Sequence, residues 1–163
     1  MSKDLHYSFL PELAAKSENE WKRYFAKNKK KIEKMDVQIH QLHEKFSDSI
    51  DCLSCANCCR SLGPRLTGKD VERMAKATGM KINIFEEKYL KKDEDNDIVF
   101  KSMPCPFLND DNYCLIYENR PKACREYPHT DRKRFFQIYN LSIKNAYTCP
   151  IVYQVLETIK DIK

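Results

Sequence analysis

The strongest chemical signal in this 163-residue chain is a group of closely spaced cysteines. The segment CLSCANCC carries Cys52, Cys55, Cys58 and Cys59. Two successive gaps of two residues let thiolates from one tight loop converge on a cation, while the turning backbone offers amide hydrogens to the sulfurs. We expect adjacent Cys58 and Cys59 to point apart, which allows a second or a multinuclear site. The segment therefore predicts thiolate coordination of a metal.

The other cysteines stand in equally marked sequence contexts. They are Cys105 in PCPFL, Cys114 in YCLIYENRP, Cys124 in RPKACREYP and Cys149 in TCP. Cys149 precedes an expected helix, whose N-terminal amides favour a thiolate. All eight cysteines are thus candidate metal ligands: Cys52, Cys55, Cys58, Cys59, Cys105, Cys114, Cys124 and Cys149.

Arginines lie next to several of these cysteines. Arg60 follows Cys59, and Arg120 and Arg125 bracket Cys124. Their guanidinium groups are available to neutralise excess thiolate charge, with ordinary surface ion pairs as the alternative.

The histidines give a weaker signal for metal binding. His129 could replace a cysteine as a ligand, although a lone histidine more often faces solvent. His40 and His43 flank an apolar helical seam, where a structural role is favoured over ligation.

Several spaced motifs agree in order with a known family. The order CxxCxxCC, a capped helix, CPFL, CxIYENRPxxCRxYP and a final cysteine resembles the YkgJ-type cysteine-cluster family, described as a zinc- or iron-chelating domain. The resemblance covers residues 52–150 and implies that the eight cysteines are the ligands. The N-terminal segment lies outside it.

The number of thiols bears on which metal is bound. Eight thiolates divide into two closed tetrahedral zinc sites, so we expect zinc. Iron or an iron–sulfur cluster is the alternative, because three cysteines at two-residue gaps, with another cysteine before proline, are similar to ferredoxin ligands. Spacing does not separate these metals, whereas coordination geometry and spectra do.

Composition and charge limit the classes of protein. No apolar run reaches the length of about 18 residues that would span a bilayer, and the N-terminus lacks a signal-peptide pattern. We therefore expect a cytoplasmic protein with reduced thiols, with a secreted disulfide scaffold as the alternative. The formal net charge of +5 falls close to neutral if the thiolates bind two divalent cations. Because basic residues are dispersed among acidic ones, nucleic acid is not an expected partner.

A long helical pattern precedes the cysteines. Between residues 10 and 50, apolar or small residues recur in steps of three or four, among them Trp21, Ile39 and Phe46. This periodicity predicts one long helix, or two helices joined near Asn28. Since the seam is long for one small domain, we expect part of it to pack on a second copy or a protein partner.

Shorter elements follow within the cysteine-rich region. Thr67 and Asp70 form a capping pattern for a helix that stops at Gly79, and Asn83 with Glu86 repeats the pattern. Strands are expected at residues 98–100, 105–108 and 113–117, the last two around a turn at residues 109–112. A final helix starts at Cys149 and Pro150.

These elements predict an α+β, mainly helical fold. We expect an N-terminal helical extension at residues 1–51. A small metal-stabilised cysteine-cluster domain with one short β-hairpin and a C-terminal helix should occupy residues 52–163.

Two classes of function fit this organisation. The first is an accessory or interaction module stabilised by thiolate-bound metal. The second is an iron–sulfur redox protein or a metalloenzyme with an open metal position. The sequence contains no phosphate loop, Ser–His pairing of recognisable spacing or Gly-rich dinucleotide turn, so we favour the non-enzymatic reading.

Overall fold

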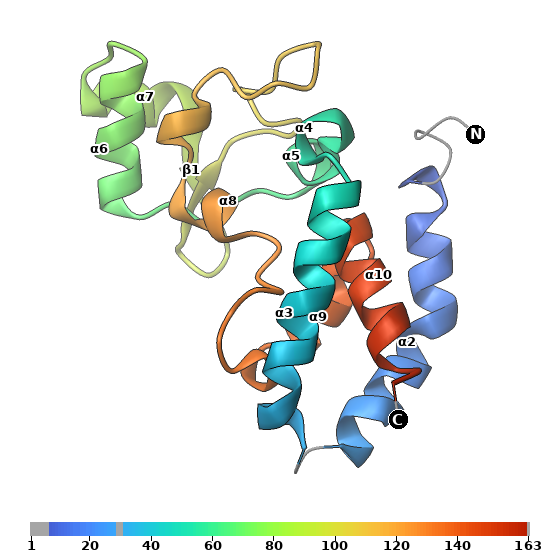
Figure 1. The fold of residues 1–163 in the computed structure, drawn as a ribbon. Coiled ribbons are helices and arrows are strands. Elements are labelled where there is room, and N and C mark those ends of the chain that lie inside the picture. The colour runs from blue at the N-terminus through green and yellow to red at the C-terminus, as the bar shows by residue number, and fades with distance from the viewer. Residues whose placement is uncertain (1–6, 29–30, 163) are drawn as a thin grey trace. The chain divides into compact units, whose positions relative to one another are not determined.

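The computed structural model describes residues 7–28 and 31–162 of the protein. The chain divides into two compact units. Unit 1 contains the chain up to residue 55 together with residues from 128 onward, and unit 2 contains residues 56–127. Helices predominate, and unit 2 also holds a two-stranded antiparallel sheet (Figure 1). The predicted α+β, mainly helical fold with one short hairpin is therefore confirmed.

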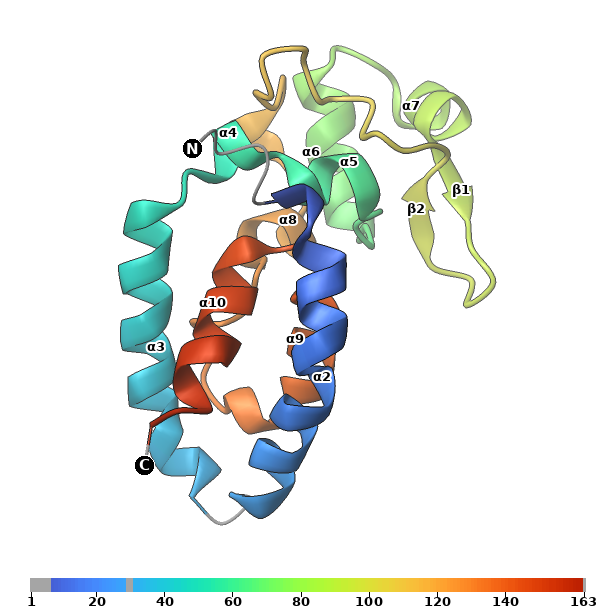
Figure 2. The same ribbon diagram turned by 90° about the vertical axis from the view of Figure 1, so that its right-hand side faces the viewer.

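Unit 1 is a helical assembly. Its elements are α2 (Leu10–Lys27), α3 (Ile32–Ser49), α4 (Cys52–Cys55), η2 (Phe135–Gln137), α9 (Tyr139–Asn145) and α10 (Pro150–Ile159). Helix α10 packs against both α2 and α3 and lies between them (Figure 2). No helix in the described ranges is long and apolar enough to cross a membrane.

The predicted N-terminal helical segment forms two helices. Helix α2 is capped at its C-terminus by Asn28, whose backbone N–H and side-chain Nδ2 both donate to the Tyr24 carbonyl oxygen at 3.1 and 2.9 Å. Satisfying this carbonyl from Asn28 closes the last turn of the helix. Of the two alternatives predicted for this segment, the structure shows the second, two helices joined near Asn28.

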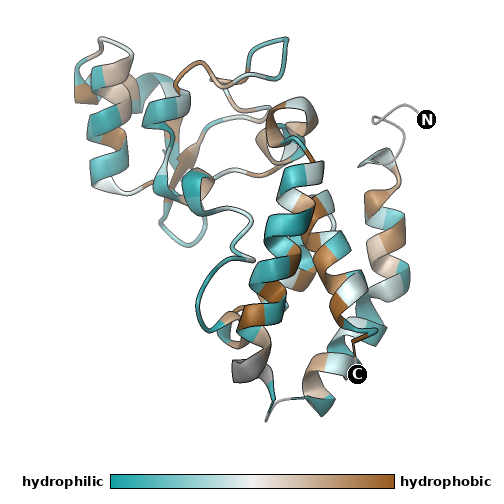
Figure 3. Cartoon of the chain, in the orientation of Figure 1, coloured by the Kyte–Doolittle hydropathy of each residue, from teal (hydrophilic) through white to brown (hydrophobic). Residues whose placement is uncertain are grey.

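The core of unit 1 covers the apolar seam of these two helices. Trp21, Phe25 and Ile39 are completely buried, together with Leu156 of α10. Figure 3 shows the apolar residues of α10, and the Trp21 indole donates to the Glu157 carboxylate of this helix at 3.0 Å. The chain's own C-terminal helix thus covers part of the seam, whereas Phe46, a later seam residue, is only half-buried.

The compact units also cut the chain differently from the predicted boundary after residue 51. The segment expected to be an extension, residues 1–51, belongs to one unit with α10, which the sequence grouped with the cysteine-rich domain. The sequence pattern marks apolar helix faces but does not say which faces meet.

Unit 2 combines short helices with the hairpin. Its elements are α5 (Asn57–Ser61), α6 (Gly68–Ala77), α7 (Ile82–Tyr89), β1 (Leu90–Lys92), β2 (Ile98–Phe100), η1 (Tyr117–Asn119) and α8 (Lys122–Glu126). The predicted capping box of α6 is present, since the Asp70 N–H donates to Thr67 Oγ1 and the Thr67 N–H donates to Asp70 Oδ2. Gly79, with φ of 68°, follows this helix. Helix α7 starts after Lys81, two residues before the predicted cap at Asn83.

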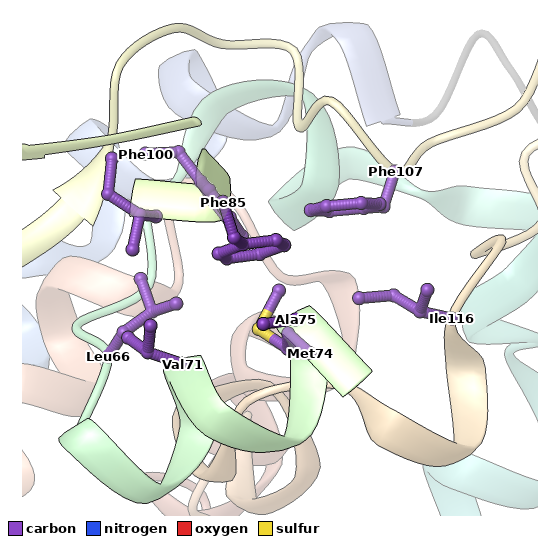
Figure 4. Close-up of a cluster of buried hydrophobic side chains, with 9 residues drawn as sticks. Leu66, Val71, Met74, Ala75, Phe85, Phe100, Phe107 and Ile116 are labelled. Carbon is purple, nitrogen blue, oxygen red and sulfur yellow. The ribbon is translucent and has the colours of Figure 1, made fainter. Parts of the chain in front are cut away.

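A cluster of buried apolar side chains holds unit 2 together (Figure 4). The rings of Phe85 and Phe107 stack with centroids 6.0 Å apart and planes within 8°. Met74 and Val71 of α6 contribute further buried surface. Cys105 and Cys114 pack against the cluster, so the core lies directly beside predicted metal ligands.

The hairpin lies elsewhere than expected. Strand β2 pairs with β1, with Leu90 opposite Phe100, and the intervening turn is closed by amides that donate to Asp93 Oδ1. The predicted pairing of residues 105–108 with 113–117 reduces to a single bridge between Leu108 and Cys114. Prolines at positions 104 and 106 supply no N–H donors, which prevents a continuous ladder there.

Candidate metal centre

The eight predicted ligands fall into both compact units. Cys52, Cys55 and Cys149 belong to unit 1. The remaining five belong to unit 2: Cys58, Cys59, Cys105, Cys114 and Cys124. Within the described residues, none of the eight forms a disulfide bond. The boundary between the units runs through the CxxCxxCC motif, directly after Cys55.

Four of the unit 2 cysteines, which we call the four-thiol group, influence one another electrostatically. They are Cys59, Cys105, Cys114 and Cys124. Charge on the first three raises the pKa of Cys124, and charge on Cys59 and Cys114 raises the pKa of Cys105. The fold of unit 2 therefore brings thiols from four separate segments within electrostatic range of one another.

Backbone hydrogen bonds position three members of this group. The Cys105 N–H donates to the Cys59 carbonyl oxygen at 2.8 Å, which ties α5 to the PCPFL segment. The Leu108–Cys114 bridge, together with an Asn109 N–H bond to the Tyr113 carbonyl at 2.9 Å, closes the turn that returns the chain to Cys114. The predicted turn at residues 109–112 thus brings Cys114 back toward Cys105.

Burial makes ionisation of these thiols unfavourable. It raises the pKa of Cys105 to about 11 and, with the charges of neighbouring thiolates, that of Cys124 to about 12. The amides of Phe107 and Leu108 oppose the rise at Cys105 by donating to its sulfur. Several thiolates held close together in a low dielectric repel one another, so the ionised group requires a compensating cation.

Arg120 supplies part of this compensation. Its guanidinium lies 3.8 Å from the centre of the Tyr117 ring and donates to the Tyr117 carbonyl oxygen at 2.7 Å. From this position its positive charge acts to lower the pKa of Cys59, Cys114 and Cys124. The guanidinium of Arg125 instead donates to the Arg120 carbonyl oxygen at 3.2 Å.

Cys58 and Cys59, which we expected to point apart, place their sulfurs 4.0 Å from each other. The hydrogen bond with Cys58, with help from the charges of Arg60 and Arg120, lowers the pKa of Cys59 to about 7 against the effect of burial. Cys59 is therefore the member of the four-thiol group whose thiolate forms most readily.

A second set, the three-thiol group, lies in unit 1 and consists of Cys52, Cys55 and Cys149. Cys149 is the N-cap of α10 and is 6% exposed. Burial, together with the charges of Cys52 and Cys55, raises the pKa of Cys149 to about 12, although two amides of the first turn of α10 oppose the rise. The expected effect of the helix N-terminus is thus present but weaker than desolvation.

The histidines have structural contacts within unit 1. The Nε2 atom of His40 donates to the Arg132 carbonyl oxygen at 3.0 Å, and His43 Nδ1 shares a 2.7 Å hydrogen bond with the Thr130 hydroxyl. His129 adopts a left-handed backbone conformation with φ of 67°. Across the described ranges, no group of three or more His, Cys, Asp or Glu side chains is already arranged to hold a metal ion.

Cys114, a member of the four-thiol group, borders an open depression in the surface of unit 2. Cys114 lines a cavity of about 580 Å³ together with Tyr113, Leu115 and Tyr117. Tyr113 and Leu115 are 51% and 66% exposed, so this side of Cys114 is open.

Two residues of α6 that the sequence did not associate with the site contact the segment before Cys124. Asp70, predicted only as a helix cap, accepts a hydrogen bond from the Lys122 N–H at 3.0 Å. Arg73 donates to the Arg120 carbonyl oxygen at 3.0 Å. The capping pattern identified Asp70, whereas no local signal indicates its contact across about 50 residues of chain.

Comparison with known families gives one match. The model of the CxxCxxCC family, described as "Putative zinc- or iron-chelating domain", matches residues 51–150. This range includes all eight cysteines. No curated protein and no solved structure shows significant similarity to the chain.

Proposed function

Because the chain belongs to the CxxCxxCC family of zinc- or iron-chelating domains, we propose that its cysteines bind zinc and that the protein is an accessory or interaction module. The proposal rests chiefly on the four-thiol group of unit 2. Its members come from segments far apart in sequence, yet the Cys105–Cys59 backbone hydrogen bond and the Leu108–Cys114 bridge connect three of these segments. Charge on these thiols also affects the pKa of Cys124.

The donor set of the four-thiol group suits a closed structural site. Four thiolates complete the tetrahedral shell that zinc prefers, leaving no open position for a substrate. Bound zinc would cross-link α5, the PCPFL segment, the strand-like segment at Cys114 and α8. Such a cross-link adds folding free energy to a small unit. We therefore favour a structural role for this site over a catalytic one.

The other four cysteines complete the proposed ligand set. The three-thiol group of unit 1 offers Cys52, Cys55 and the buried Cys149, and charge on the first two affects the third. Cys58, beside Cys59, is the eighth proposed ligand. Binding of divalent cations by these thiolates would bring the net charge of +5 closer to neutral.

An iron–sulfur redox protein or a metalloenzyme is the alternative function. The closely spaced CxxCxxC cysteines and the Cys149–Pro150 pair favour the redox alternative, because ferredoxins hold their clusters with similar spacings. In that case the thiols would serve electron transfer, and the protein would absorb visible light.

Elemental analysis of the full chain, purified without oxygen, tests the proposal. We expect a colourless protein that carries zinc, with unchanged metal content in His129→Ala as the control for a bystander side chain. Cys105→Ser should lower the zinc content, because it removes one of four thiolates from a closed site. A brown protein containing iron and acid-labile sulfide would establish the alternative, and protein without metal would refute both.

A further inference from the structure

We propose that the Asp70–Arg73 pair of α6 positions Cys124 for metal binding by holding the chain segment that precedes it. The inference rests on the proposed function, since it concerns a ligand of the four-thiol group. It assigns to α6 a role beyond the packing of the apolar core.

Asp70 is a buried carboxylate that serves two helices. The residue is 1% exposed. Its Oδ2 atom accepts hydrogen bonds from the N–H and hydroxyl of Thr67, at 2.9 and 2.7 Å, and so caps α6. Its Oδ1 atom accepts from the Lys122 N–H at 3.0 Å, at the first residue of α8. The two oxygens thus divide the capping of the two helices between them.

Arg73 extends this connection along the same segment. Its Nη2 atom lies 2.5 Å from Asp70 Oδ1 and 3.0 Å from the Arg120 carbonyl oxygen, and its Nε atom lies 3.4 Å from the Asn119 carbonyl oxygen. Because the buried carboxylate is paired with the guanidinium, its charge is compensated. The pair therefore holds three backbone groups within residues 119–122.

Cys124 follows this segment and lies in a helix that is too short to be stable on its own. Helix α8 spans only Lys122–Glu126, and isolated helices of this length are unstable in water. The orientation of the Cys124 thiol therefore depends on how the first residue of α8 is held. Asp70 and Arg73 provide that restraint without contacting the thiol, so we class them as positioning residues.

Three single variants of the full chain separate positioning from general stability. Asp70→Asn keeps the side-chain volume but weakens both caps. Arg73→Met removes the bonds to the two carbonyls and the ion pair with Asp70, while leaving the hydrogen bonds of the α6 capping box. Thr67→Ala is the matched control, because it weakens the α6 cap and leaves the segment before Cys124 untouched. Each variant is loaded with Co²⁺ as a spectroscopic substitute for zinc.

The measurements are cobalt affinity, the intensity of sulfur-to-cobalt charge transfer, and alkylation of Cys124 followed by mass spectrometry. We expect Asp70→Asn and Arg73→Met to lower cobalt affinity about tenfold, to reduce the thiolate intensity and to expose Cys124 to alkylation in the loaded protein. Thr67→Ala should change cobalt affinity less than about twofold. This should hold even if its melting temperature falls as much as those of Asp70→Asn and Arg73→Met. If Asp70→Asn does not fold, Arg73→Met alone decides the question.

Two results would overturn the inference while the proposed function stands. One is an Arg73→Met protein that binds cobalt as tightly as wild type and keeps Cys124 protected from alkylation. The other is a loss of cobalt affinity in Thr67→Ala as large as the loss in Arg73→Met. A wild-type chain that binds no cobalt through thiolates overturns the proposed function, and the inference with it.

Discussion

At the scale of single residues, the chemistry of the candidate site is a balance between burial and compensating charge. Burial raises the pKa of Cys105 to about 11, whereas the hydrogen bond with Cys58 and two arginines hold that of Cys59 near 7. Arg120 contributes to this compensation at three of the four thiols. Metal binding requires thiolates, so this arginine should set the pH range over which the site loads.

Replacing Arg120 with Gln tests this role. Removing the guanidinium raises the thiol pKa values, so a metal-loaded variant should lose its metal at a higher pH than wild type as acid is added. At neutral pH the metal affinity should fall about tenfold, as for other groups that support ligands. A metal-indicator titration at several pH values provides both measurements.

Two further variants serve as controls for this experiment. Arg120→Lys keeps a positive charge and should retain part of the affinity. Arg125→Gln removes a guanidinium that donates to the Arg120 carbonyl oxygen, and this variant should load like wild type. Equal behaviour of Arg120→Gln and Arg125→Gln would show that the specific position of Arg120 does not matter.

At the scale of elements, the helices of unit 1 pair their apolar faces within the chain. Helix α10 covers the seam of α2 and α3, and Ile39 of α3 is completely buried. Burial of this side chain stabilises the unit through removal of apolar surface from water. Substitutions on this seam should therefore act on folding rather than on association.

Ile39→Asp tests which of these effects applies. A charge placed in the buried seam should lower the free energy of unfolding by about 4 kcal/mol or more, as measured by urea denaturation followed through Trp21 fluorescence. Val37→Asp, on the same helix but at a position 64% exposed, should change it by less than about 0.5 kcal/mol. If Ile39→Asp instead stays folded and its mass in light scattering falls below that of wild type, the seam mediates self-association, as the sequence suggested.

Local signals explain which elements could be predicted. The Thr67–Asp70 capping box fixes the start of α6, and Pro150 after Cys149 fixes the start of α10, because each depends on residues within one turn. The hairpin was misplaced because strand pairing depends on register between separate segments, and residues 90–92 carry little strand pattern.

The same distinction applies to the candidate site. All eight candidate cysteines could be identified from their spacing and contexts. Their division could not, because it depends on which segments the folded chain brings together: Cys55 and Cys58, three residues apart, belong to different compact units. The link from Asp70 to Lys122 is likewise a tertiary contact with no local signature.

At the scale of the whole molecule, each compact unit combines an apolar core with a group of thiols. The apolar cluster at the centre of unit 2 contains nine buried residues, a small number for residues 56–127. Domains of this size often need a metal or another cross-link for stability. A four-thiolate site beside this core would supply such a cross-link, which is the central claim of the proposed function.

The most direct test is X-ray absorption spectroscopy on zinc-loaded protein in which Cys52, Cys55, Cys58 and Cys149 are all replaced by serine. This variant retains only the four-thiol group, and its reciprocal, with the four-thiol group replaced, is the control. We expect one zinc per chain, with four sulfur ligands at about 2.3 Å, in the first variant. Loss of zinc from that variant, or nitrogen and oxygen ligands in place of some of the sulfurs, would contradict the assignment of Cys59, Cys105, Cys114 and Cys124 to one closed site.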